Sequence, residues 1–203
     1  MKKIMLTSFA VIFFLFQSNG QISFGVKAGI NSSNLTGLSH KNDNYFNSTF
    51  ARTCDYFGFF SEIKLNKKFS IQPEILGSGK GFGYVVNPAS KNIISLNYIS
   101  IPVLIKYNYT NKLSFLLGPE FNFLIQKSFS SQYLEVGTNN SFNLGIDLGI
   151  ACKLNKKFGA EVRYCYDFND KIVITYPDVW GELLVRYTEG RSSVLQAGLF
   201  YIF

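Results

Sequence analysis

Apolar and polar residues alternate one for one along eight stretches of this chain. The stretches lie near residues 22–31, 53–65, 69–78, 94–109, 113–126, 141–154, 158–168 and 192–203. A period of two places successive side chains on opposite faces of a β-strand, so each stretch predicts a strand with one apolar face. The connections between the strands are in turn short and long. The short ones are 66–68, 110–112 and 155–157, and the long ones are 32–52, 79–93, 127–140 and 169–191. This order is typical of an eight-stranded antiparallel up-and-down transmembrane β-barrel.

The short connections share a sequence motif. KLNKKF occurs at Lys64–Phe69 and again at Lys153–Phe158, with a looser echo at Tyr109–Phe115. Asparagine tolerates the left-handed backbone of a tight turn, and lysine keeps a turn in water. We therefore predict hairpin turns at Asn66-Lys67-Lys68, Asn111-Lys112 and Asn155-Lys156-Lys157. The alternative, a duplicated functional site, is disfavoured because only turn chemistry is repeated.

Alternation alone does not separate a membrane barrel from a soluble sandwich. The apolar faces, however, run for about five to seven positions, near the length that a tilted strand needs to cross a bilayer. Aromatic residues also gather at the short-turn ends of the strands, where they would form a girdle at one membrane interface. These residues are Phe69, Tyr107, Tyr109, Phe158, Tyr201 and Phe203. The pattern favours an outer membrane.

The polar faces carry charges of both signs in near balance. By their register, the residues that point into the barrel are Lys27, Glu62, Lys64, Glu74, Lys106, Glu120, Asp147, Lys153, Glu161, Arg163 and Asp167. An interior of eight strands is just wide enough for side chains to fill it, and buried charges must pair. We therefore expect a salt-bridged plug and no wide water pore.

The first twenty residues have the pattern of a secretory signal peptide. Met1-Lys2-Lys3 is basic, Ile4–Phe16 is apolar, and Ser18-Asn19-Gly20 resembles a cleavage site, so residues 1–20 are expected to be removed and 21–203 to form the barrel domain. Without Lys2 and Lys3 the formal charge falls from +7 to +5. That charge is too scattered for nucleic-acid binding. The cysteines are odd in number and far apart, at Cys54, Cys152 and Cys165, so we interpret them as small apolar residues that fill space and not as a disulfide framework.

Catalytic and metal-binding patterns are not apparent. The one histidine, His40, lies in a long loop near Ser39 and Asp43, a spacing that matches no known nucleophile arrangement. A single histidine with scattered carboxylates predicts no metal site, and no cofactor motif is present. The glycine-rich stretch Gly77–Gly83 opens no helix, so we interpret it as a strand end that enters a flexible outer loop. We expect no enzyme, cofactor or metal.

The loop 169–191 holds two strand-like runs, Ile172–Tyr176 and Leu183–Tyr187. We expect them to form a hairpin that extends the seventh and eighth strands above the membrane. The residues at its tip are Pro177, Asp178, Val179 and Trp180. An exposed edge with an aromatic tip suits a partner that adds a strand. The alternative is a hairpin that only packs on its neighbours.

Several of these stretches resemble one family. They are Phe24–Gly37, Ile71–Leu76 with Lys80-Gly81, Tyr98–Tyr107, Gly118–Leu124, Arg163-Tyr164 and Leu195–Phe203. The chain resembles the PorT-like outer-membrane β-barrels of Bacteroidota along nearly its whole mature length. The resemblance implies an outer-membrane barrel whose terminal aromatic serves the barrel-assembly machinery. It implies no single activity, since some members resemble parts of a secretion and gliding apparatus.

The expected function is structural, adhesive or accessory to an envelope machine. The expected partners are outer-membrane lipid, the assembly machinery and an envelope or extracellular protein. One alternative is a narrow channel for small solutes, which needs a gap in the charged interior. Another is a soluble secreted barrel that binds lipid, which needs an apolar interior.

Overall fold

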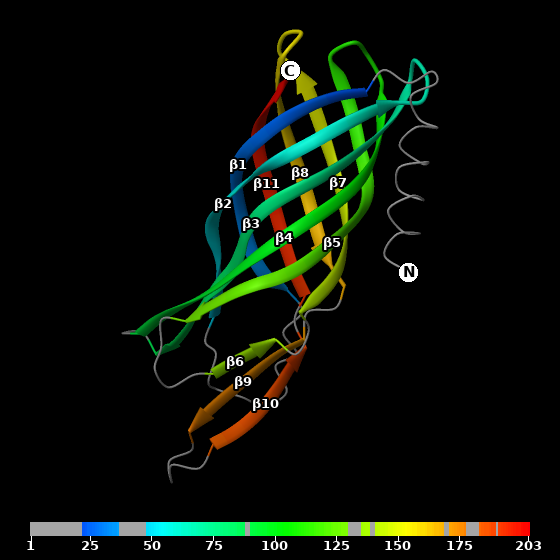
Figure 1. The fold of residues 1–203 in the computed structure, drawn as a ribbon. Helices are drawn as coiled ribbons and strands as arrows, with labels where there is room; N and C mark the ends of the chain where they lie inside the picture. The colour runs from blue at the N-terminus through cyan, green and yellow to red at the C-terminus, as the bar shows by residue number, and fades with distance from the viewer. Residues whose placement is uncertain are drawn as a thin grey trace, which may run out of the picture.

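The computed structural model describes residues 22–36, 48–87, 90–129, 135–138, 141–168, 171–177, 183–189 and 191–203. Within them, eight antiparallel strands close into a barrel in the order β1-β11-β8-β7-β5-β4-β3-β2 (Figure 1). The strands are β1 (Ile22–Thr36), β2 (Ser48–Lys64), β3 (Phe69–Asn87), β4 (Ser90–Asn108), β5 (Leu113–Phe129), β7 (Phe142–Lys153), β8 (Phe158–Asp167) and β11 (Arg191–Ile202). The first and last strands close the barrel, with Gly25 opposite Ile202 and Thr36 opposite Arg191. The predicted fold class is confirmed.

The barrel carries its large apolar side chains on the outside. Phe57 and Phe59 on β2 are 68% and 66% exposed, whereas the next residue, Phe60, points into the barrel and is 4% exposed. Apolar residues outside and charged residues inside reverse the arrangement of a soluble protein and suit a lipid environment. In the described part of the chain, no helix has the length and apolarity needed to span a membrane.

The turns at one end are built by side-chain oxygens. Asn66 Oδ1 accepts hydrogen bonds from the amides of Lys68 and Phe69, at 2.8 and 2.9 Å. Asn155 Oδ1 does the same for the two amides that follow Lys156, at 2.8 and 2.7 Å. All three predicted hairpins form, but in the turn between β4 and β5 the acceptor is Thr110 Oγ1 and not Asn111. The asparagines thus act as hydrogen-bond acceptors for the turn backbone.

The aromatic residues beside these turns contact one another across neighbouring strands. The ring centroids of Phe69 and Tyr107 are 5.2 Å apart, and those of Phe158 and Tyr201 are 4.8 Å apart. Tyr201 also meets Phe203, at 5.8 Å. The predicted girdle is therefore a set of packed pairs at the end where the C-terminus lies (Figure 1).

The loop predicted at 79–93 is wrong. β3 and β4 have 19 residues each, and they stay paired up to the contact of Asn87 with Ser90. The glycine-rich stretch Gly77–Gly83 is part of β3. Glycine suggested a loop, but inside a strand it also allows close backbone approach. At Gly81 (φ 145°) a Cβ would lie 2.1 Å from the carbonyl oxygen of Ile94. Figure 1 shows these two strands reaching beyond the barrel.

A second sheet lies at the end opposite the short turns (Figure 1). It has the order β10-β9-β6, from β6 (Glu135–Thr138), β9 (Lys171–Pro177) and β10 (Leu183–Glu189). The predicted hairpin is present as β9 and β10, with Leu183 opposite Pro177. Its predicted position is wrong, since β9 pairs with β6 and does not continue the ladder of β8 and β11. The signal for β6 was missed because four residues are too few to show a period.

Candidate functional site: the charged barrel interior

All of the barrel strands send a polar side chain into the interior, and the charged ones, from every barrel strand except β11, form three groups along the barrel. We name them by their position. The central cluster is Lys27, Glu74, Asp147, Glu161 and Arg163; the outer cluster is Lys80, Glu120 and Asp167; the turn-side pair is Glu62 and Lys106. Each of these residues is at most 3% exposed.

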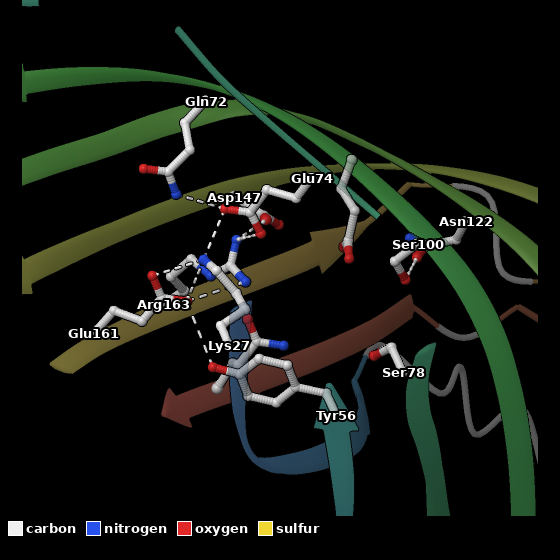
Figure 2. A network of polar contacts seen from close by, with 12 residues as sticks. Lys27, Tyr56, Gln72, Glu74, Ser78, Ser100, Asn122, Asp147, Glu161 and Arg163 are labelled. Atoms are coloured by element: carbon white, nitrogen blue, oxygen red, sulfur yellow. Dashed lines mark hydrogen bonds and ion pairs between the residues drawn. The ribbon is translucent and has the colours of Figure 1, made fainter. Parts of the chain in front are cut away.

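Lys27 on β1 holds the central cluster together (Figure 2). Its Nζ lies 2.8 Å from Glu74 Oε1 on β3 and 2.8 Å from Glu161 Oε1 on β8. Arg163 joins the same two carboxylates, with Nη1 3.0 Å from Glu74 Oε2 and Nη2 3.4 Å from Glu161 Oε1. Two cations and two carboxylates therefore neutralise one another across the middle of the barrel.

Neutral side chains complete the central cluster. Gln72 Nε2 donates to Glu74 Oε1 at 2.7 Å, and the Tyr56 hydroxyl donates to Glu161 Oε1 at 3.5 Å (Figure 2). Asp147 Oδ2 is 3.4 Å from Arg163 Nη1, but its Oδ1 makes no hydrogen bond to the described residues. The carboxylate of Asp147 is thus held more loosely than those of Glu74 and Glu161.

The outer cluster lies nearer the second sheet. Lys80 Nζ on β3 bridges Glu120 Oε2 at 3.3 Å and Asp167 Oδ2 at 3.2 Å. Asn122 Nδ2 donates to the other oxygen of Asp167 at 3.0 Å, and Asn122 Oδ1 accepts from the hydroxyl of Ser100. These contacts join β3, β4, β5 and β8, so the outer cluster also crosses the whole lumen.

Towards the short turns, an apolar layer lies between the central cluster and the turn-side pair, and Gln72 bridges it with hydrogen bonds to Glu74 and from Lys106, at 2.7 and 3.4 Å. The layer consists of Phe60, Leu104, Leu116, Ala151 and Phe200. Beyond it, Lys106 Nζ meets Glu62 Oε2 at 2.8 Å, and the hydroxyl of Ser70 donates to Glu62 Oε1 at 3.2 Å. The lumen therefore holds ion pairs on both sides of an apolar layer, with Gln72 linking the two levels.

The structure places most of the predicted interior residues in these three groups. The residues brought together are Lys27, Glu62, Glu74, Lys106, Glu120, Asp147, Glu161, Arg163 and Asp167. The other two differ from the prediction: Lys64 is exposed and Lys153 is half-buried, and both line the open end of the barrel. Strand ends project past the lumen, so the same inward register leads to solvent there.

Lys80 was not among the predicted interior residues. It continues the inward register of Gln72, Glu74, Leu76 and Ser78. It was not predicted because the predicted strand ended at residue 78. The predicted tip residues Asp178, Val179 and Trp180 lie outside the described residues, as do His40 and residues 1–20. For Pro177 the structure describes the backbone alone, at the end of β9.

One group of described residues could hold a metal ion. Ligand atoms of Glu120, Asp147 and Cys165 lie within 4.8 Å of one another, and all three residues are buried. Lys80 contacts the carboxylate of Glu120 and Arg163 contacts that of Asp147, so cations of the protein already lie beside both carboxylates. Cys54, Cys152 and Cys165 are all free thiols.

The model of one protein family matches residues 16–173, and its description is "outer membrane protein beta-barrel domain". The chain belongs to this family and is thus a small outer-membrane β-barrel. A comparison with curated protein sequences gives no match.

Solved structures of outer-membrane proteins share the fold. The protein is similar to OprG from Pseudomonas aeruginosa, with a TM-score of 0.54 and 15% identity over 92% of this chain and 98% of that one. It is similar to Ail, the attachment invasion locus protein of Yersinia pestis, with a TM-score of 0.51 and 16% identity over 91% and 99%. Neisserial surface protein A follows, with a TM-score of 0.50 and 14% identity over 89% and 97%.

Proposed function

We propose that this protein is a closed, non-catalytic outer-membrane scaffold that presents binding elements at the cell surface. The observation that carries the proposal is the filled interior, in which buried ion pairs join strands on all sides of the lumen. A solute would have to break these pairs, and an uncompensated buried charge costs about 3–5 kcal/mol. The ends of the barrel are therefore the places where it acts.

The end of the barrel opposite the short turns carries the second sheet and the long β3–β4 hairpin, which are the larger surfaces for a partner. Short turns face the periplasm in outer-membrane barrels, so the second sheet and the long β3–β4 hairpin are placed outside the cell. A membrane strand needs roughly 10 residues, and the 19 residues of β3 and of β4 leave roughly half of each strand beyond the bilayer. Strand edges at this surface suit a partner that binds by β-augmentation.

The proposal includes an adhesive or accessory role. Ail, which shares the fold, is named for attachment and was solved with the heparin analogue sucrose octasulfate. The resemblance to PorT-like barrels of Bacteroidota favours a component of an envelope machine, with export by a cleaved signal and insertion by the barrel-assembly machinery. The soluble lipid-binding alternative needs an apolar interior, and the described interior is charged.

Conductance across planar bilayers tests whether the barrel is closed. We expect the folded protein to give no steady channel events, because both ion clusters block the lumen. A variant lacking the central cations, Lys27→Ala with Arg163→Ala, serves as the comparison if it still folds. Steady conductance from the unaltered protein would instead support the narrow channel.

Surface display tests the binding role. Cells that display the protein are compared with cells that display a variant in which residues 171–189 are replaced by a short glycine-serine linker. The deletion removes β9 and β10 and leaves every barrel ladder in place. We expect the protein to raise adherence to heparin-coated surfaces or epithelial layers and the variant to lose that gain. Equal adherence of displaying and empty cells would contradict the adhesive role.

A further inference from the structure

The short-turn end of the barrel contains a hollow of about 790 Å³. Such a volume lies in the range of ligand sites, roughly 300–1,000 Å³. The residues that line the hollow are Glu62, Lys64, Leu65, Asn66, Lys67, Lys68, Asn108, Tyr109, Thr110, Asn111 and Lys153. It is thus formed by two of the turns and by the last inward-facing residues of β2 and β7.

The charge of this hollow is strongly one-sided. Four lysines line it, and the acidic residue among its lining, Glu62, already lies 2.8 Å from the Nζ of Lys106. The three turn segments 64–68, 108–112 and 153–157 together hold seven lysines and no acidic residue. A concave site lined by one sign of charge concentrates the field and attracts ions of the opposite sign.

The lysines at the mouth of the lumen favour a soluble ligand over a lipid, although the girdle residue Tyr109 also lines the hollow. Lys64 and Lys153 follow the inward register of Glu62 and Ala151, so they surround the mouth of the lumen. Lys157, in contrast, donates a hydrogen bond to the hydroxyl of the girdle residue Tyr201 at 3.3 Å, and its Nζ lies 5.5 Å from that ring centroid. Lysines of the same repeated phrase therefore differ in what they face.

We propose that this hollow is a binding site for a carboxylate-rich peptide segment of a periplasmic partner. The lysines supply the positive charge. The amide nitrogens of Asn66 and Asn111 and the hydroxyls of Tyr109 and Thr110 can donate hydrogen bonds to the backbone carbonyls of such a peptide. The outer-membrane barrel then has two working ends, and this one does not depend on the surface role proposed above.

The repeat in the sequence provides a matched pair of variants. Lys67→Gln with Lys68→Gln removes two lysines of the hollow. Lys156→Gln with Lys157→Gln removes the same two residues from the second KLNKKF phrase, and neither Lys156 nor Lys157 lines the hollow. Folding of each variant is checked by its resistance to SDS without heating.

The experiment measures fluorescence anisotropy of a labelled hexaglutamate peptide with the protein in nanodiscs of phosphatidylcholine, which leave both barrel ends open. We expect binding that weakens as salt is added, since exposed charges are screened over about 8 Å at physiological ionic strength. The Lys67/Lys68 variant should bind roughly tenfold more weakly, as two exposed ion pairs would predict, and the Lys156/Lys157 variant should bind like the unaltered protein.

Three results would overturn the proposal. Hexaglutamate fails to bind at low salt, or both paired variants lose affinity equally, which would indicate a diffuse charge effect. In the third, short-chain phosphatidylglycerol binds through the hollow lysines and hexaglutamate does not, so that the site takes a lipid headgroup. Hexaglutamine serves as the uncharged control and should not bind.

Discussion

Lys27 shows how single residues determine this interior. Its ammonium group lies between Glu74 and Glu161, and the side chains of Lys27 and Glu74 are 0% exposed. A buried ion pair adds little net stability, because desolvation offsets the attraction, but the loss of one partner leaves a charge without compensation. The contribution of Lys27 therefore appears chiefly when it is removed.

We expect Lys27→Met to lower the free energy of unfolding by about 3–5 kcal/mol. Methionine has a similar length but cannot neutralise either carboxylate. Urea unfolding in lipid vesicles measures the change, and Lys156→Met on an exposed turn is the control, with little effect. An unchanged midpoint for Lys27→Met would contradict this expectation and would mean that Arg163, which contacts both carboxylates, compensates them without Lys27.

Period-two register was enough to predict most of the interior residues, because in a barrel the register alone decides which face a side chain takes. It could not find Lys80, whose strand was ended too early at glycines. Nor could it separate Lys64 and Lys153 from the buried lysines, since the sequence does not mark where the lumen ends. The acceptor role of Thr110 was not predicted, because Thr110 stands where the other two turns have Asn66 and Asn155.

At the scale of elements, β3 and β4 differ most from expectation. Glycines at positions 77, 79, 81 and 83 made this stretch look like a loop. In the strand they serve close contacts: a Cβ at Gly83 would lie 2.0 Å from the ring of Phe50, and one at Gly81 would meet the backbone of Ile94. These glycines therefore permit β3 to continue to Asn87, although their loop propensity predicted an end at residue 78.

Gly81→Ala tests this role of glycine. The positive φ and the close carbonyl of Ile94 should make the substitution cost about 1–3 kcal/mol, confined to the outer part of the β3–β4 ladder. Hydrogen exchange should show faster exchange in 82–87 and 90–94 with the barrel intact. Gly77→Ala is the matched control, because its Cβ would have ordinary contact with Phe57 at 3.4 Å. Equal protection in both variants would contradict the argument.

For the whole molecule, the sequence determined the class of fold with few ambiguities. Strand number, the alternation of short and long connections and the apolar faces all follow from membrane geometry, which leaves few alternatives. The second sheet was only half predicted. β9 and β10 are joined by a local hairpin, whereas β6 joins them from a distant loop, and the pairing of distant segments leaves no local pattern.

A folded outer-membrane barrel should resist SDS until it is heated. We expect the outer-membrane fraction to show a band whose mobility changes on boiling, because the barrel ladders and the ion clusters keep the unheated protein compact. The measurement is a gel of boiled and unboiled samples, with the soluble fraction beside them. A soluble protein without such a shift would mean that the faces are assigned the wrong way round.

The central cluster also constrains the order of assembly. Lys27 meets a carboxylate 134 positions further along the chain, and Glu74 meets an arginine 89 positions on. An early group of strands laid into lipid would lack part of its counter-charge, since the partners on β8 had not yet arrived, and unmatched charges in a bilayer are costly. Stepwise insertion, hairpin after hairpin, is therefore unfavourable for this chain. The early strands supply some of these pairs, such as Lys27 with Glu74, but Arg163, Glu161 and Asp167 arrive only with β8, so the neutralised interior is complete only when the last strands are present.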